Sequence, residues 1–141
     1  SYRVHLDGYN FLPYFQGQTD EGPRDEMFYF TDDGSVSALR YHDWKLNFTT
    51  QRAHGLEVWS EPYVVERVPV LTNLRMDPFE RAQHEGIDYN RWFIDHMFVL
   101  VPAQAYVGNF LQTFQEFPPR QKPGSFSLDN VLEELQQPQP N

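Results

Sequence analysis

The stretch DEMFYFTDDGSVSALRYHDWKLNFTT, residues 25–50, decides the fold. It contains three segments rich in apolar and β-branched residues, separated by two short groups of turn-forming residues. Asp33-Gly34 suits a hairpin turn that needs positive φ, and His42-Asp43 fills the second gap. Turns of this length join neighbouring antiparallel strands, so the stretch predicts a β-meander. The predicted strands are Asp25–Thr31, Ser35–Tyr41 and Trp44–Thr50.

The first predicted strand is apolar on both of its faces. Met27 and Tyr29 alternate with Phe28 and Phe30, so each face carries two large side chains. A strand of this kind is expected to be covered on both sides. The third predicted strand alternates apolar and polar residues from Trp44 onwards, which is typical of a half-buried strand.

A fourth strand is predicted at Val68–Leu74, where Pro69 favours a strand end or a sheet edge. The excursion Gln51–Arg67 precedes it and contains Trp59 and Tyr63 without a clear periodicity. Loops longer than about 12–15 residues are usually functional or disordered. The two large aromatic residues favour an ordered loop that packs against another surface.

Helical patterns follow the strands. Residues 77–80, Asp-Pro-Phe-Glu, have the chemistry of a helix start: a carboxylate cap, a proline and a capping-box glutamate. Residues 88–117 form the longest helical pattern, which Pro102 is expected to end or kink. Residues 127–137 predict a last helix. The expected fold is therefore α+β, with a four-stranded antiparallel β-meander packed on C-terminal helices. The predicted apolar stripe is Phe93, Met97, Leu100, Gln104, Val107, Leu111 and Phe114.

Length and composition exclude several classes of protein. The 141 residues correspond to about one domain with its own core. Eleven basic against 20 acidic residues, a net charge of −9, argue against a nucleic-acid partner and against binding to an anionic membrane. The chain has no cysteine, which excludes disulfides, thiolate metal sites and a cysteine nucleophile here. No apolar run approaches the roughly 18–20 residues of a membrane span.

The ionisable residues form no recognisable catalytic or metal motif. No two of the five histidines are two or four residues apart, and His84-Glu85-Gly86 lacks the second histidine of a metalloprotease helix. The pair Asp32-Asp33 is explained by turn chemistry, and Glu133-Glu134 by a solvated helix face. Nucleophile-elbow, phosphate-loop and dinucleotide motifs are absent from the sequence. We therefore predict no catalytic, cofactor-binding or metal-binding residue in this chain.

The order of these segments resembles a known enzyme family. Residues 23–45, with PRDEMFYF, DDG, ALRY and WKL, and residues 71–82, with TNL and DPFERA, carry the resemblance. LVPAQA at 100–105 and EFPPRQKPGSF at 116–126 extend it. Together they are similar to the C-terminal subdomain of bacterial arylsulfatase-like sulfatases, members of the alkaline phosphatase-like superfamily. The domain organisation that the resemblance implies is a linker from a missing catalytic domain at 1–24, the α+β subdomain at 25–137 and a flexible tail at 138–141.

The resemblance also implies that the chemistry lies on another part of the parent protein. Sulfatases use a formylglycine made from Cys or Ser in a Cys/Ser-x-Pro-x-Arg motif, usually with a calcium ion held by the large N-terminal domain. Neither form of that motif occurs in this chain. Formylglycine and calcium are thus implied for the full-length parent, and this chain alone is expected to be inactive. Its expected role is to support the fold and to wall part of the cleft for a sulfate ester.

Four residues are candidates for the rim of that cleft. Trp59 and Tyr63 lie in the excursion before the fourth strand, and Arg120 and Lys122 lie in a Pro/Gly-rich loop that could present two cations to an anion. One face of the strand 25–31 is expected to meet the chain's own helices. The other face is expected to meet the missing catalytic domain, or a second copy of the chain in a homo-oligomer. Export is common among similar bacterial proteins, which implies a periplasmic or secreted location.

Two other functions stay open. Phosphodiesterases and phosphonate hydrolases share the architecture of the superfamily, so the parent could cleave a different ester. The chain could instead be a non-catalytic module that binds glycans through Trp44, Trp59 or Trp92, although Trp44 and Trp92 lie at positions with a core pattern.

Overall fold

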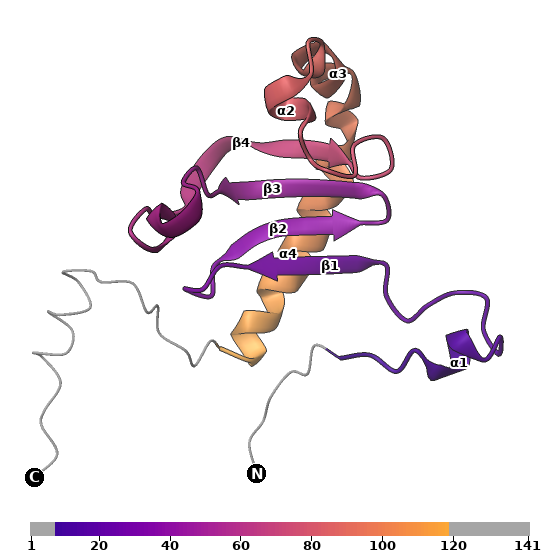
Figure 1. Cartoon of the computed structure of the whole chain (residues 1–141). Helices are drawn as coiled ribbons and strands as arrows, with labels where there is room; N and C mark the ends of the chain where they lie inside the picture. Colours follow the sequence, from indigo (N-terminus) through magenta and orange to yellow (C-terminus); the bar gives the residue numbers. More distant parts are fainter. Residues whose placement is uncertain (1–7, 119–141) are drawn as a thin grey trace, which may run out of the picture.

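A computed structural model describes residues 8–118, which form one antiparallel sheet with the strand order β1-β2-β3-β4. The long helix α4 crosses behind the sheet and covers one face of it (Figure 1). This confirms the predicted α+β fold with a four-stranded antiparallel meander. The predicted helix at 127–137 lies outside the described residues. The strands are β1 (Glu26–Phe30), β2 (Val36–Tyr41), β3 (Trp44–Thr50) and β4 (Val64–Asn73). The helices, with η for 3-10 helices, are α1 (Leu12–Phe15), η1 (Gly55–Trp59), α2 (Ala82–Glu85), α3 (Tyr89–His96), η2 (Met97–Val99) and α4 (Leu100–Glu116).

A row of leucines at the centre of the sheet forms the core. Leu39 pairs with Leu46 and Leu46 with Leu71, and residues directly opposite each other share a face. The three side chains are at most 1% exposed. Val99 and Ala103, from η2 and α4, are also buried and pack in the same cluster. Apolar burial between this row and the helix therefore holds the two layers together.

Aromatic pairs extend the contact between sheet and helix towards β1. The Phe28 ring stacks on that of Phe110 with centroids 4.1 Å apart, and the Phe30 ring lies 5.8 Å from Phe110. This face of β1 therefore meets the chain's own helix, as predicted. The rings of Tyr41 and Tyr106 lie 4.7 Å apart in the same layer. A hydrogen bond with Tyr41, together with burial, raises the pKa of Tyr106 to about 12.

The continuous apolar stripe predicted along the helical region is wrong in its phase. The 3-10 helix η2 separates α3 from α4. Because a 3-10 helix turns by about 120° per residue and an α-helix by about 100°, its three residues shift the pattern by about 60°. Val99 and Ala103 are consequently buried. Pro102 lies in the first turn of α4, where a backbone donor is not needed. The exposed members of the predicted stripe are Met97, Gln104 and Leu111.

Strand β4 is longer than predicted and irregular. It begins at Val64 rather than Val68, so the excursion before it is shorter than expected. Asn47 pairs with Val70, whereas Thr49 pairs with Val65, and the register shift means that β4 bulges between these two valines. Pro69 lies in the bulge, on an edge strand, where its missing N–H interrupts no regular ladder.

The predicted capping box at 77–80 does not form. Helix α2 begins only at Ala82, whose N–H donates a hydrogen bond of 2.8 Å to Asp77 Oδ2. Glu80 has a φ of 55° and lies outside the helix. Its two carboxylate oxygens each accept a hydrogen bond of 2.8 Å from Lys45 Nζ on β3. A charged donor is a stronger partner for glutamate than the neutral N–H of a capping box, which accounts for the difference.

Asp77 should make the stability of the fold sensitive to acid. Burial works to raise the pKa of its carboxyl, but backbone hydrogen bonds from residues 79–82 outweigh burial and lower that pKa. Because the pKa of this carboxyl is lower in the folded than in the unfolded protein, the ionised group stabilises the fold at every pH above its unfolded-state pKa. That stabilisation is lost as the pH falls through the folded-state pKa. We expect Asp77→Asn to lose less thermal stability than the wild type between about pH 6 and about pH 2. Asp95→Asn, at an exposed position on α3, is the control and should leave the pH profile unchanged.

The Lys45–Glu80 ion pair should stabilise the fold more than an ordinary surface pair. The two side chains are 18% and 33% exposed, and Lys45 Nζ also lies 5.0 Å from the centroid of the Tyr29 ring. We expect Lys45→Met and Glu80→Gln each to cost about 1–2 kcal/mol, with a coupling energy of about 1 kcal/mol in a double-mutant cycle. Urea unfolding of the four proteins measures this. A coupling of zero would mean that the pair adds no net stability.

Candidate functional site

A groove of about 880 Å³ lies at the end of the sheet where the β1–β2 turn approaches the excursion before β4. We call it the hairpin groove. Both walls project from the same end of the sheet (Figure 1), one from the first hairpin and the other around η1. Its volume is within the range of about 300–1,000 Å³ that is common for small-molecule sites. The groove is lined by Thr31, Asp32, Asp33, Ser35, Thr49, Val65 and residues 58–63.

The η1 wall is fixed by local hydrogen bonds. The carbonyl oxygen of Glu57 accepts hydrogen bonds of 3.0 Å from the N–H groups of Ser60 and Glu61 and one of 3.1 Å from Ser60 Oγ. Gln51 Nε2 donates a 2.9 Å hydrogen bond to the carbonyl oxygen of Glu61. Trp59 stands on this tied segment, yet its side chain is 87% exposed. The wall therefore presents an indole ring from an ordered backbone.

The opposite wall is the turn between β1 and β2. Thr31 N–H donates to the Ser35 carbonyl at 2.9 Å, and Ser35 N–H donates to Thr31 Oγ1 at 3.2 Å. Gly34 closes the turn with a φ of 79°, a conformation that glycine adopts at little cost. Thr49 also lines the groove, and its hydroxyl lies 2.8 Å from that of Ser37. The groove is thus lined in part by hydroxyl groups.

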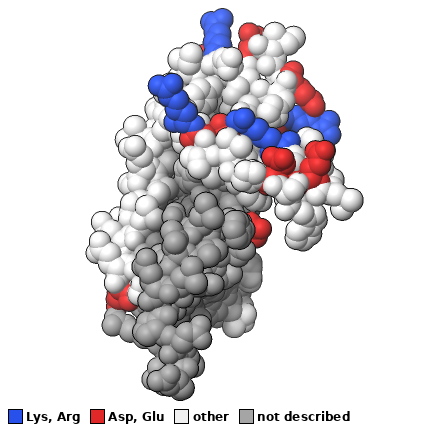
Figure 2. Space-filling view, turned by 90° about the vertical axis from the view of Figure 1, so that its left-hand side faces the viewer, with Lys and Arg blue, Asp and Glu red and all other residues white. Residues whose placement is uncertain are grey.

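The charged side chains among the described residues that line the groove are all acidic. Asp32, Asp33 and Glu61 line it, and the described residues that line it include no Lys, Arg or His. Sulfate and phosphate esters carry negative charge, so the electrostatic field here opposes their binding. Figure 2 views this end of the molecule and shows basic and acidic side chains interleaved over its upper part.

The structure brings together two of the four predicted rim residues. Trp59 and Tyr63 line the hairpin groove, whereas Arg120 and Lys122 lie outside the described residues. In the sequence, turn chemistry is sufficient to explain Asp32-Asp33, and no motif connects this pair with Trp59. A doubly acidic hairpin turn is a weak sequence signal, because turns favour aspartate whether or not they bind a ligand.

The other two tryptophans, Trp44 and Trp92, are half-buried and pack on the core. The rings of Trp44 and Trp92 stack with centroids 6.0 Å apart, and both residues pack against the buried cluster. His96 stacks on Trp92 at 4.6 Å, and its Nδ1 lies 2.7 Å from the Trp92 carbonyl oxygen. Both indoles therefore contribute to packing between the sheet and the helices.

A smaller hollow of about 410 Å³ contains two histidines, His54 and His84. Its acidic member, Glu66, accepts a 2.6 Å hydrogen bond from Thr50 Oγ1 and lies 3.7 Å from Arg52 Nη2. Within residues 8–118, no three histidine, aspartate or glutamate side chains are placed to hold a metal ion. Over the same residues, no helix has the length and apolar character needed to cross a membrane.

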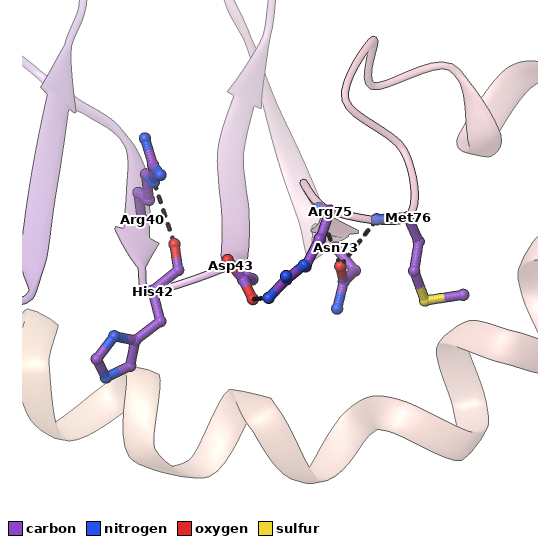
Figure 3. A network of polar contacts seen from close by, with 6 residues as sticks. All are labelled: Arg40, His42, Asp43, Asn73, Arg75 and Met76. Atoms are coloured by element: carbon purple, nitrogen blue, oxygen red, sulfur yellow. Dashed lines mark hydrogen bonds and ion pairs between the residues drawn. The ribbon is translucent and has the colours of Figure 1, made fainter.

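A polar network at the opposite end of the sheet stabilises the fold (Figure 3). Arg40 Nε donates to the His42 carbonyl oxygen at 3.1 Å, and Arg75 Nη1 lies 3.8 Å from Asp43 Oδ2. Asn73 Oδ1 accepts hydrogen bonds of 3.1 Å from the N–H groups of the two residues that begin at Arg75. These contacts fix the β2–β3 turn and the end of β4, so this network is a structural feature.

Comparison with known proteins assigns no family: no protein-family model matches the chain, and none of the curated proteins has significant similarity to it.

Proposed function

We propose that this chain is the C-terminal subdomain of an arylsulfatase-like sulfuric ester hydrolase, in which it supports a larger catalytic domain. Two observations support the proposal. The motifs at 23–45 and 71–82 resemble that subdomain, and the described fold is the four-stranded meander with a covering helix that the resemblance implies. The sequence lacks the formylglycine motif on which sulfatase chemistry depends. The reaction itself would therefore be carried out by the larger domain.

An exposed apolar stripe on the helices carries the proposed support role. Ile94, Phe98 and Val101 are 66%, 66% and 70% exposed and come from α3, η2 and α4 in turn. Met97 lies between them and is 42% exposed. Isolated apolar residues on a surface are ordinary, but several large exposed ones within eight residues of the chain favour a partner. We assign this helix stripe as the surface that meets the catalytic domain.

The outer face of β1 is less apolar than its sequence predicts, so we propose that it has a smaller part in this contact. Met27 is 37% exposed, but Tyr29 is half-buried and packs beside Lys45 Nζ. Arg40, which pairs with Met27, is exposed and makes this face partly polar. The proposed interface is therefore centred on the helix stripe, and β1 would lie at its margin.

Enzyme assays on the longer gene product test the proposed function. The chain extended upstream to include the region that precedes it should hydrolyse p-nitrophenyl sulfate, whereas the 141-residue chain should not. Bis(p-nitrophenyl) phosphate, offered in parallel, separates a sulfatase from a phosphodiesterase of the same superfamily. Hydrolysis of a sulfate ester by the 141-residue chain, or an upstream region with no formylglycine motif, would refute the proposal.

A substitution in the helix stripe tests the support role. Phe98→Ser should leave the thermal stability of the 141-residue chain nearly unchanged, because the side chain is already exposed to water. In the longer protein the same change should lower the unfolding temperature by several degrees, since there it would leave a gap in a domain interface. Leu56→Ser, also exposed but on η1, is the matched control and should be silent in both proteins. Equal effects in the two proteins would place the interface elsewhere.

A further inference from the structure

The hairpin groove holds an aromatic ring that the described part of the chain leaves uncovered. The Trp59 side chain is 87% exposed. Its segment is nevertheless held by the hydrogen bonds to the Glu57 carbonyl oxygen and by the one from Gln51 to Glu61. Because this backbone is already ordered, a ligand that covers the ring does not have to order the segment, and the apolar face of the indole gains from leaving water. Trp59 therefore has the properties of a preformed stacking platform.

The polar side chains that line the groove carry carboxylates or hydroxyls. Asp32 and Glu61 supply carboxylates from the two walls, and Ser35 and Thr49 supply hydroxyls. Ionised carboxylates accept stronger hydrogen bonds than neutral groups do, and they donate none. A ligand that suits the groove therefore carries several donors and also has an apolar face for the indole.

Sugars meet both requirements, since each pyranose ring has an apolar face of C–H groups and a rim of hydroxyl donors. A sulfated or phosphorylated sugar would be repelled by the acidic lining. A groove of about 880 Å³ that is open to solvent suits an extended ligand better than a single small ion. We propose that the hairpin groove binds a neutral oligosaccharide, with one ring on Trp59 and its hydroxyls donating to Asp32 and Glu61. This inference does not depend on the proposed hydrolase function.

Two matched pairs of variants in the full 141-residue chain test the site. Leu56 and Trp59 lie in the same 3-10 helix and are equally exposed, at 87%, but only Trp59 lines the groove. Glu57 is likewise an exposed acid of η1 that does not line it, and so is the control for Asp32. All four side chains are exposed, so their replacement should leave the fold intact. Thermal unfolding of each variant verifies this.

The probes are the hexasaccharides of cellulose, starch and chitin, together with a sulfated form and a deacetylated, cationic form of the chitin hexasaccharide. Isothermal titration calorimetry gives the dissociation constants. We expect at least one neutral hexasaccharide to bind, at least about tenfold more weakly to Trp59→Ala and about threefold or more weakly to Asp32→Asn. Leu56→Ala and Glu57→Gln should bind within about twofold of the wild type.

Three results would overturn the proposal. The first is that no neutral hexasaccharide binds. The second is that Leu56→Ala weakens binding as much as Trp59→Ala does. The third is that the sulfated form binds more tightly than the neutral one, which would assign the groove to an anion. Tighter binding of the cationic form would support the contact with Asp32 and Glu61, since carboxylates attract a cation. None of these outcomes bears on the proposed hydrolase role, which is tested on the longer gene product.

Discussion

Replacing Leu39 by alanine is expected to lower the free energy of unfolding by about 2–5 kcal/mol. The side chain is fully buried at the centre of β2, opposite Phe28 on β1 and Leu46 on β3. Alanine would lose the buried methyl groups and leave a cavity, because the two flanking strands hold the backbone in place. Domains of this size have a total stability of about 5–15 kcal/mol, so the variant would retain only part of it. Urea unfolding followed by tryptophan fluorescence and circular dichroism measures the difference.

Leu56→Ala is the control for this substitution. It makes the same chemical change at a position that is 87% exposed and has no role in the core. The expected change in the free energy of unfolding is within about 0.5 kcal/mol. A similar loss of unfolding free energy in the two variants would contradict the placement of the core at Leu39, Leu46 and Leu71.

Replacing Phe110 by alanine should detach the C-terminal half of α4 from the sheet, at a cost of about 3 kcal/mol. Its ring lies 4.1 Å from that of Phe28, 5.8 Å from that of Phe30 and 5.1 Å from that of Phe114. One substitution therefore removes three aromatic contacts, each of which adds to the apolar area that the helix buries. Hydrogen exchange should report faster exchange of the backbone amides of α4 after Phe110, in addition to the lower stability in urea.

The neighbouring residue supplies the control for the Phe110 experiment. Leu111 lies on the outer side of α4 and is 47% exposed, so Leu111→Ala should cost less than about 1 kcal/mol. It should leave the exchange of the α4 amides close to that of the wild type. Equal effects at the two positions would mean that α4 faces the sheet with a different side than the structure indicates.

The sheet was predictable because its signals are local. Alternation with a period of two marks a strand within seven residues or so, and Asp33-Gly34 marks the turn between two strands. The predicted boundaries of β3 match the observed strand, Trp44–Thr50. The predicted first strand is one residue too long at each end, and the predicted second strand begins one residue too early. Strands joined by turns this short pair with their neighbours in the chain, which predicts the order of the first three strands.

The helical region was less predictable, because no sequence motif marks the 3-10 helix η2 that separates α3 from α4. Phe93, Leu100 and Val107 of the predicted stripe do pack against the core, but the 3-10 residues of η2 rotate the face that follows them. The role of Glu80 was also not predictable from local sequence. A glutamate three residues after an aspartate satisfies the rule for a capping box, and only the approach of Lys45, 35 residues away, gives its carboxylate a better partner.

The sequence by itself determined the strands, their order and the absence from this chain of a formylglycine motif and of cysteine chemistry, since these depend on residue identity and short spacing. The tertiary structure alone decided the phase of α4, the Lys45–Glu80 pair and the meeting of Trp59 with the β1–β2 turn. The physical reason is separation along the chain. Asp32 and Trp59 lie on different loops, and only the pairing of four strands brings those loops to one end of the sheet.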